Sequence, residues 1–433
     1  MRVIAYLATA GVAAIVSFAL SMVIWKLSHR FRLYPKIRER DVHTRPTPRL
    51  GGIAMFLGIV AAFAVGAFIP QLALVYSQPV HIWGLLGSAL MIVLIGVADD
   101  IWDLDWLTKL AGQLLAAALL AWSGIQFLSF PIPQLGNPGN GTLVTPASWQ
   151  SLIITVLLIV LVMNAINFID GLDGLVAGVA IIANGVFSVY VFFISSGPTG
   201  QSDYFNLAQL ISAVLIGVCV GFLPLNWHPA RLFMGDAGAL LVGLMMAAST
   251  ISVTSQINPV ALEDSVGSAR QYLPALIPLL LPFAILVIPL LDFGLAVIRR
   301  LRAGKSPFSA DRKHLHHRLL DMGHSHLHAV LILYGWTAAA SIGMLLFLFI
   351  DTWWAALATL LGLVACTIIT LAPFSRRKAV EAAVQSTAGV LPGSELARFD
   401  PLDAAADEVG EPSDSNAREA LERLHEHEKE GTA

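Results

Sequence analysis

The chain is 433 residues long, and 56% of these residues are hydrophobic whereas only 13% are charged. Its mean hydropathy of +0.73 is too high for a soluble globular protein of this length, so that class is excluded. The formal net charge is −3, and we expect a lipid bilayer rather than a nucleic acid as the partner that surrounds the chain.

Apolar runs long enough to cross a hydrocarbon layer of roughly 30 Å recur along the chain and predict about eleven transmembrane helices. The runs lack the alternating polar residues that the wall of a β-barrel needs. The sequence therefore predicts an all-α, polytopic membrane protein. The runs begin near Val3, Gly51, Ile82, Leu107, Ser151, Gly174, Asn206, Gly238, Leu273, Leu327 and Thr352.

Lys and Arg residues predict the orientation of these helices, because positively charged loops stay in the cytoplasm. One basic group follows the first run, so we expect the N-terminus outside and the first run to be a retained anchor rather than a cleaved signal. Alternating helices then place two further basic groups on the same side, in agreement with an odd number of helices. The three groups lie within residues 26–49, 299–318 and 376–378.

Composition changes abruptly after Phe374, where the chain becomes rich in Ala, Glu and Asp and contains several Pro and Gly residues. We therefore predict two parts: a polytopic membrane domain at residues 1–378, and an acidic, largely disordered cytoplasmic tail at residues 379–433. A short helix at residues 417–430 that docks on a partner is the alternative within the tail.

Four carboxylates occur within seven residues after the third run. Such a group of like charges at a membrane surface repels itself, and a divalent metal would remove the conflict. Carboxylate oxygens suit magnesium, which commonly combines one or two carboxylates with substrate phosphates. The alternative is an acidic helix end exposed to water. Lys109 and Gln113 follow at helical spacing and are expected to face the same cavity. The four carboxylates are Asp99, Asp100, Asp103 and Asp105.

A second polar stretch ends the fifth run, at residues 164–174. Asn164 and Asn167 are three residues apart and share a helix face, and glycines then break the helix where Asp170 and Asp173 appear. We expect these side chains to contribute to the same site. The alternative is that the asparagines only join neighbouring helices.

A third stretch, at residues 226–238, joins the seventh and eighth runs and contains Asn226, Gly235 and Asp236. Its glycines allow the backbone and a ligand to approach closely, and the start of a helix suits an anion bridged by a metal. The alternative is that Asp236 serves only as the N-cap of the eighth helix.

A fourth stretch, at residues 305–318, combines histidines with basic residues. Basic neighbours suit a diphosphate, and the chain offers no companion thiolates for zinc. Zinc binding and a simple basic surface loop remain the alternatives. The candidate residues are His314, His316, His317 and Arg318.

Taken together and in this order, the motifs resemble those of the polyprenyl-phosphate N-acetylhexosamine-1-phosphate transferases, which form glycosyltransferase family 4. The bacterial branch that transfers N-acetylglucosamine-1-phosphate to undecaprenyl or decaprenyl phosphate is the more similar one. The motifs are PTPRLGG at residues 46–52, DDIWD at 99–103, NAINFIDGLDGL at 164–175, NWHPARLFMGDAG at 226–238 and HLHHRL at 314–319.

The resemblance implies that a sugar-1-phosphate, here N-acetylglucosamine-1-phosphate, passes from a UDP-sugar to polyprenyl phosphate with release of UMP. This reaction is the first lipid-linked step of cell-envelope polysaccharide synthesis, at the cytoplasmic face of the bacterial inner membrane. The implied cofactor is magnesium, with manganese as the alternative ion, and a homodimer is left open.

The resemblance also assigns roles to residues. Asp100 and Asp236 are expected to bind the metal, with Asp99 as a further metal-site carboxylate or a base, and His316 completes the catalytic set of Asp99, Asp100 and His316. The expected nucleotide or metal-site residues are Asn164, Asn167, Asp170, Asp173 and Asn226. The diphosphate is expected to contact Lys109, His314, His316, His317 and Arg318, and the lipid phosphate Arg45 and Arg49.

Two positions depart from the family pattern. Ala239 stands where a serine is common, and residues 35–37 read Pro-Lys-Ile where an Asp-x-Pro segment is usual. The competing class is a transporter for a metal ion or a lipid-linked solute. Transporters commonly show repeated halves and polar groups near the bilayer midplane, whereas the polar groups here are predicted at one surface.

Overall fold

The computed structural model describes residues 2–31, 47–127, 130–132, 142–144, 146–195, 203–254, 301–302, 304, 319 and 324–371. All of them belong to one compact unit, Met1–Lys36 with Pro46–Ala372. The predicted boundary at residue 378, and the tail that follows it, lie outside the described residues and stay predictions.

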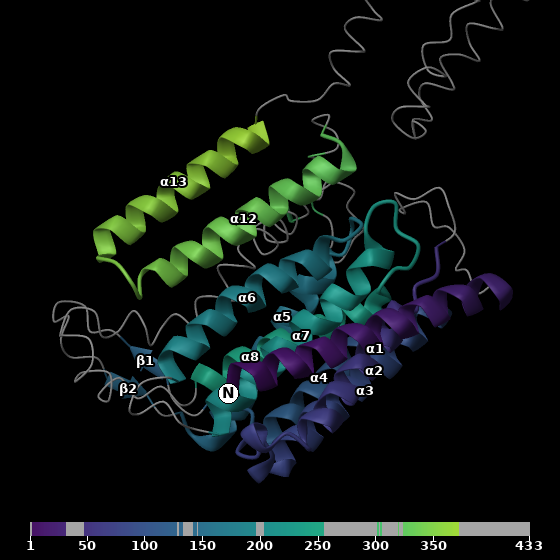
Figure 1. The fold of residues 1–433 in the computed structure, drawn as a ribbon, viewed down its shortest axis with the longest axis horizontal. Coiled ribbons are helices and arrows are strands. Elements are labelled where there is room, and N and C mark those ends of the chain that lie inside the picture. Colours follow the sequence, from purple (N-terminus) through teal and green to yellow (C-terminus); the bar gives the residue numbers. More distant parts are fainter. Residues whose placement is uncertain are drawn as a thin grey trace, which may run out of the picture. The chain divides into compact units, whose positions relative to one another are not determined.

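Helices make up nearly all of the described chain, as predicted for an all-α protein (Figure 1). The exception is a small antiparallel ribbon of β1 and β2, which pairs Phe130 with Val144. The helices are α1 (Arg2–Phe31), α2 (Gly51–Gly66), η1 (Pro70–Leu72), η2 (Val75–Ser77), α3 (Pro79–Trp102), α4 (Trp106–Trp122), α5 (Ser148–Ile169), α6 (Leu175–Ser195), α7 (Asp203–Asn226), α8 (Gly235–Thr254), α12 (His326–Leu346) and α13 (Thr352–Leu371), and the strands are β1 (Phe130–Ile132) and β2 (Thr142–Val144).

Eight helices of the described chain are long and apolar enough to cross a membrane, and α2 and α4 are shorter apolar helices. The predicted apolar runs within the described ranges all correspond to helices, which confirms a polytopic helical membrane protein. The run near Leu273 lies outside the described residues, so the total of eleven stays a prediction.

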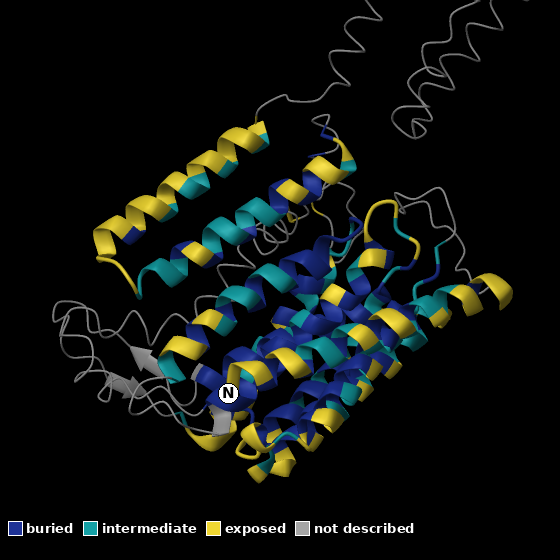
Figure 2. Cartoon of the chain, viewed as in Figure 1, coloured by how far each residue is buried: buried dark blue, intermediate teal, exposed yellow. Residues whose placement is uncertain are grey.

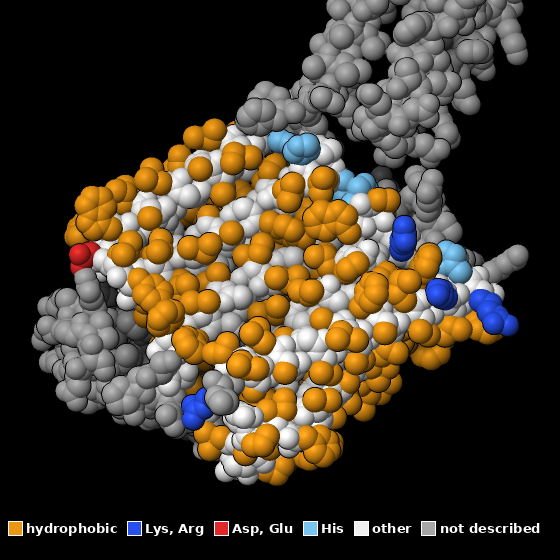
Figure 3. Space-filling view, in the orientation of Figure 1, with side chains coloured by type: hydrophobic (Ala, Val, Ile, Leu, Met, Phe, Trp, Pro, Cys, Tyr) orange, Lys and Arg blue, Asp and Glu red, His pale blue; other side chains and the backbone are white. Residues whose placement is uncertain are grey.

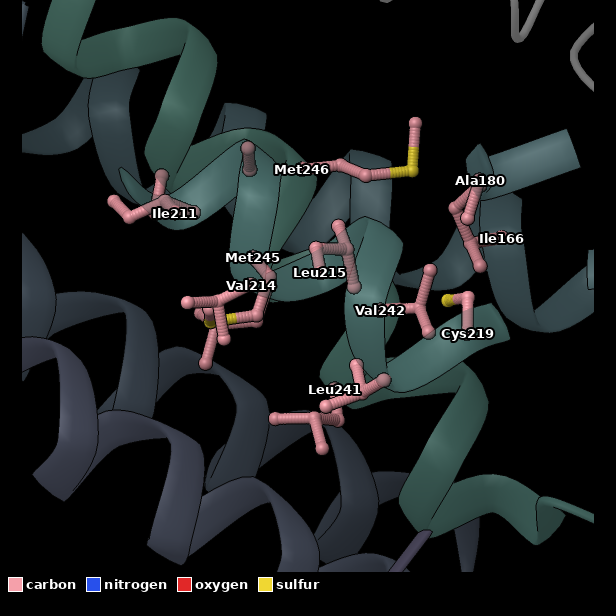
Figure 4. Packing of buried hydrophobic residues seen from close by; sticks show 14 of the residues in the cluster. Ile166, Ala180, Ile211, Val214, Leu215, Cys219, Leu241, Val242, Met245 and Met246 are labelled. Carbon is pink, nitrogen blue, oxygen red and sulfur yellow. The ribbon is translucent and has the colours of Figure 1, made fainter. Parts of the chain in front are cut away.

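Helix α8 is the central element of the bundle and packs against α2, α3, α5, α6 and α7. In the most apolar 18-residue stretch of α8, 94% of the residues are buried inside the protein, compared with 6% in the corresponding stretch of α13 (Figure 2). A helix that is hydrophobic on all sides is expected in such a position. Figure 4 shows the packing around it, where Ile166, Ala180, Leu215 and Val242 from four different helices meet, all of them fully buried.

On the face drawn in Figure 3, hydrophobic side chains cover much of the described surface, with few charged ones among them. Trp122 and Trp353 are each 87% exposed, and the exposed hydrophobic residues are spread over most of the helices. In water such a surface would associate with itself, whereas in a bilayer it contacts lipid tails.

Small residues bring α2 and α3 close to the beginning of α8. A Cβ atom added at Gly52 would collide with the backbone of Ala237 and Gly238, and one added at Gly96 would collide with the backbone of Ala237. The amides of Gly51 and Gly52 donate to the carbonyls of Phe233 (3.0 Å) and Met234 (2.9 Å), which satisfies donors that the start of α2 would otherwise leave unpaired. The contacts of Gly51 and Gly52 fix the start of α8 against α2, and the close approach at Gly96 places it against the C-terminal half of α3.

The substitution Gly96→Ala is expected to force α3 away from α8, because the new methyl group meets backbone atoms rather than a flexible side chain. Overpacking of this kind typically lowers the free energy of unfolding by about 1–3 kcal/mol. Thermal unfolding in detergent measures the change. The matched control is Gly185→Ala on α6, where nothing lies within 4 Å of the added atom. Equal melting temperatures for the two variants would contradict the close packing of α3 on α8.

Candidate active site

Three carboxylates from two helices meet at one end of the bundle. Lys109, in the first turn of α4, forms an ion pair with Asp99 of α3 and another, at 3.3 Å, with Asp236 of α8. The backbone amide of Asp236 lies 3.4 Å from Oδ1 of Asp100. The structure therefore brings Asp236, from a distant part of the sequence, to Asp99, Asp100 and Lys109, as predicted.

Helix ends explain why only two of the four clustered aspartates face this site. Asp103 ends α3 in a left-handed conformation, with φ 54°, and its amide donates to the carbonyl of Asp99. Asp105 is the N-cap of α4 and accepts from the amides of Leu107 (3.1 Å) and Thr108 (3.0 Å). Hydrogen bonds from the side chain and backbone of Thr108 hold the pKa of the exposed Asp105 carboxyl below its usual value. The alternative of an acidic helix end is thus correct for Asp103 and Asp105.

The turn before α8 lets its backbone reach the α3 carboxylates. Gly235 has φ 68°, and a Cβ atom there would collide with Oδ2 of Asp100 and with the backbone carbonyl of Arg49. Only glycine meets both conditions, a positive φ and no side chain. The backbone of Arg49 therefore lies beside the site.

Asp100 shows most directly how the site would accept a cation. Its Oδ2 is buried and has no hydrogen-bond partner within the described part of the chain. A buried carboxylate oxygen without a donor is costly, and a metal ion would remove that cost. With Asp99 and Asp236 close by, the donors are carboxylate oxygens, the set that magnesium prefers. The residues present fit a hard divalent cation.

Asn164 and Asn167 of α5 make different contacts. The side chain of Asn167 lies beside Asp236 and favours its ionised carboxylate. Asn164 instead donates from Nδ2 to Oε1 of Gln113 on α4, at 2.5 Å, and to the carbonyl of Val160, at 2.8 Å. Pairing between helices, one of the two sequence interpretations, therefore describes Asn164, whereas Asn167 contacts the candidate site.

Asp170 lies in the turn after α5. Burial, together with the negative charges of Asp236 and Asp173, raises its pKa to about 7, and the positive charge of Arg49 acts in the opposite direction. Mutual repulsion among acidic residues is what the sequence predicts for this end of the bundle. A bound cation would lower this pKa by favouring the ionised form.

Asn226 is held by the protein itself. Its Oδ1 accepts from the amide of Gly174 at 3.0 Å, and its Nδ2 donates to the carbonyl of Leu232 at 3.1 Å. The side chain thus ties the α5–α6 turn to the α7–α8 connection. Any contact of Asn226 with a nucleotide stays a prediction.

Three side chains that sequence reasoning did not single out, those of His228, His326 and Tyr334, lie at Asp173 and Gly174. His228 Nδ1 and the amide of Ala230 donate to Oδ2 of Asp173 at 2.8 and 3.0 Å. The amide of Asp173 donates to Nε2 of His326 at 3.2 Å, and the hydroxyl of Tyr334 donates to the carbonyl of Gly174 at 2.5 Å. His228 was inside a quoted motif, but no spacing rule connects it with two residues of α12.

The remaining predicted residues are not placed. Arg45, His314, His316, His317 and Arg318 lie outside the described residues. Their predicted contacts with phosphate groups, and the catalytic role of His316, stay predictions.

Comparison of the sequence with known proteins identifies the family of this chain. Residues 82–254 match the model of Glycosyl transferase family 4. A decaprenyl-phosphate N-acetylglucosaminephosphotransferase of Mycobacterium tuberculosis is 40% identical over 365 residues, which cover 84% of this chain and 88% of that protein. The chain belongs to glycosyl transferase family 4.

Two further relatives show the breadth of glycosyl transferase family 4. A probable undecaprenyl-phosphate N-acetylglucosaminyl 1-phosphate transferase of Bacillus subtilis is 30% identical over 328 residues, 75% of this chain and 80% of that protein. A phospho-N-acetylmuramoyl-pentapeptide-transferase of Desulforudis audaxviator is 29% identical over 270 residues, 58% of this chain and 77% of that protein. The family match runs from α3 to α8 and so includes the three carboxylates and Lys109, but not α12.

The substitution Asn226→Ala is expected to leave a buried amide and a buried carbonyl without their partner, at about 1–3 kcal/mol for each group. Hydrogen exchange should therefore become faster at the amide of Gly174. The matched control is Asn184→Ala, which removes another buried asparagine whose bond, to the carbonyl of Ala180, stays within α6. Unchanged exchange at Gly174 in Asn226→Ala would contradict the bridging role.

Asp170 predicts a pH dependence of stability. Its folded pKa is raised from 3.8 to about 7, so the folded state holds a proton that the unfolded state releases, and stability falls as pH rises from about 4 to 7. In buffer without divalent ions, Asp170→Asn should raise the melting temperature at pH 8 but hardly at pH 4. The gain is at most about 4 kcal/mol.

The control for this pH experiment is Asp105→Asn, because Asp105 is exposed and its pKa is lowered. It should show no gain at pH 8. A melting-temperature difference between Asp170→Asn and the unsubstituted protein that does not change with pH would contradict the raised pKa.

Proposed function

We propose that the chain transfers N-acetylglucosamine-1-phosphate from UDP-N-acetylglucosamine to a polyprenyl phosphate, releasing UMP and forming polyprenyl-diphosphate N-acetylglucosamine. The observation that carries the proposal is the carboxylate cluster of Asp99, Asp100 and Asp236, held with Lys109 at one end of an apolar bundle. The relatives named above, whose printed names describe such transferases, support the same reaction.

Both reactants of this transfer are anionic, so their approach requires positive charge at the reacting phosphates. We assign a magnesium ion, with manganese as the alternative, to Asp100 and Asp236, with Asp99 beside them. Bound there, the ion would neutralise charge on the diphosphate. Lys109 supplies a further positive charge between Asp99 and Asp236.

A general base is not required to activate the acceptor. The second pKa of a phosphate monoester is about 6, so its oxygen is already largely ionised at neutral pH. That oxygen attacks the phosphorus that carries the sugar, and the bond between this phosphorus and the oxygen of UMP breaks. The ion pair with Lys109 makes Asp99 better suited to hold charges in place than to accept a proton. A covalent aspartyl intermediate is the alternative route.

The remaining roles follow from position and from the family motifs. Asn167, Asp170 and Asp173 would bind or orient the nucleotide, and Asn226 would hold the turn that carries Asp173. Arg45 and Arg49 would contact the lipid phosphate. The histidine-rich stretch would bind diphosphate oxygens, through His314, His316, His317 and Arg318.

The end of the bundle that carries the site is proposed to be cytoplasmic. Arg231, in the connection before α8, lies over the ring of Trp25 at 5.7 Å, so the basic end of α1 is on the side of the carboxylates. That end of α1 carries Lys26, His29 and Arg30, and positive charge favours the cytoplasmic side. The protein would then lie in the bacterial inner membrane, where a cytosolic UDP-sugar meets a membrane-bound lipid phosphate.

The experiment incubates purified protein with UDP-N-acetylglucosamine, decaprenyl phosphate and magnesium, and measures released UMP. Asp100→Asn and Asp236→Asn should each lower turnover by more than about 100-fold, because each removes a ligand of the ion that would neutralise charge on the reacting phosphates. The matched control is Asp105→Asn, which removes an acidic charge from the same stretch but keeps a good N-cap residue, and it should retain turnover.

The outcomes separate the candidate functions. A transporter would release no UMP under any condition. Full turnover of folded Asp100→Asn at saturating magnesium would overturn the ligand assignment while leaving the transfer reaction in place. Release of UMP only with another UDP-sugar would correct the sugar.

A further inference from the structure

A second group of metal-binding side chains lies next to the carboxylate cluster but uses different chemistry. Asp173, His228 and His326 each offer one ligand atom, and these atoms all lie within 4.8 Å of one another. Asp173 comes from the α5–α6 turn, His228 from the α7–α8 connection and His326 from the first turn of α12. Two connections and the start of a helix, all distant in sequence, therefore meet at this point.

The donor set distinguishes this group from the magnesium ligands. Two imidazole nitrogens and one carboxylate oxygen are donors that suit zinc and similar transition-metal ions, whereas magnesium takes oxygen donors. Zinc sites with three protein ligands commonly keep a further position for water. The side chain of Asp173 is only 1% exposed, whereas that of His228 is 42% exposed, so the group extends from a buried carboxylate to the surface.

The distances are close to those of a coordinated ion. His228 Nδ1 and Asp173 Oδ2 lie 2.8 Å apart, and two ligands of one tetrahedral zinc ion are separated by roughly 3.3 Å. Nε2 of His326 already accepts a hydrogen bond, from the amide of Asp173, so this nitrogen carries a lone pair rather than a proton. The two imidazole rings are stacked with centroids 4.5 Å apart and planes 12° apart. Coordination therefore requires the exposed His228 ring to rotate and His326 to exchange one hydrogen bond for a metal bond.

We propose that Asp173, His228 and His326 form a second cation site, which takes zinc-class divalent ions in preference to magnesium. The bound ion replaces the proton between His228 and Asp173, and that proton leaves to solvent. It also joins the start of α12 to the two connections beside the candidate active site, so occupancy stabilises the folded chain. The proposal does not depend on the transferase reaction.

The test measures zinc bound by the full-length protein in detergent, after removal of metals, by equilibrium dialysis against zinc with excess magnesium present. His228→Ala and His326→Ala should each lose the same one equivalent of bound zinc, and the double variant should lose no more. Affinity at that site should fall by more than roughly 100-fold, since even residues that only support metal ligands contribute 10–100-fold. Zinc should raise the melting temperature of the unsubstituted protein more than that of either variant.

Two controls keep the result specific. His29→Ala removes an exposed histidine whose ring contacts the Trp25 carbonyl on α1, and should bind as much zinc as the unsubstituted protein. Asp100→Asn should also keep the equivalent, because it alters only the carboxylate cluster. Zinc held by other histidines of the chain is common to all variants and cancels in the comparison.

Equal zinc binding by His228→Ala and the unsubstituted protein would overturn the proposal, as would loss of the equivalent in Asp100→Asn. If His326→Ala does not fold, His228→Ala decides the question, because its ring is partly exposed. Failure of zinc binding with normal UMP release would reject this site alone and leave the proposed function intact.

Discussion

The ion pairs of Lys109 allow acidic residues from α3 and α8 to share one small volume at the end of an apolar bundle. Asp99 and Asp236 each contact its amino group, and Asp100 lies beside the backbone of Asp236. Without a cation, carboxylates at this distance repel one another and lose solvation energy on burial. Lys109 neutralises part of that charge. Among the described residues, Oδ2 of Asp100 is buried without a hydrogen-bond partner, an arrangement suited to a divalent ion.

The arrangement depends on how closely the backbones approach. Gly52 and Gly96 leave room for the first turn of α8, and Gly235 provides the turn that delivers Asp236 to Asp100. Because α8 contacts five other helices, its start is fixed by packing in nearly every direction. Packing therefore holds the carboxylates, which lie at helix ends, in fixed positions. Asp99 and Asp100 are adjacent in the sequence, whereas Asp236 comes from a distant helix.

Polar residues at this end of the bundle form two groups with different tasks. The carboxylates and Lys109 concentrate charge where two anionic reactants are proposed to meet. The group around Asp173 instead ties the α5–α6 turn to the α7–α8 connection and to α12, through His228, Asn226 and Tyr334. Buried polar groups that are all hydrogen-bonded specify one arrangement of the loops that carry them. Asp170 and Asp173, three residues apart, thus belong to different groups. Asp170 is repelled by other acidic groups, whereas Asp173 accepts hydrogen bonds from His228 and Ala230.

The sequence by itself determined the helices, because a run of apolar residues that must satisfy its backbone within lipid has no other stable form. The resemblance of its motifs to those of the family also implied that Asp99, Asp100 and Asp236 belong to one site. Only the tertiary structure decided that Asp103 ends α3 and Asp105 caps the start of α4, that Asn164 pairs with Gln113 and that His326 reaches Asp173. Those outcomes depend on the rotation of each helix and on contacts between residues far apart in the chain, and hydrophobic periodicity carries no information about either.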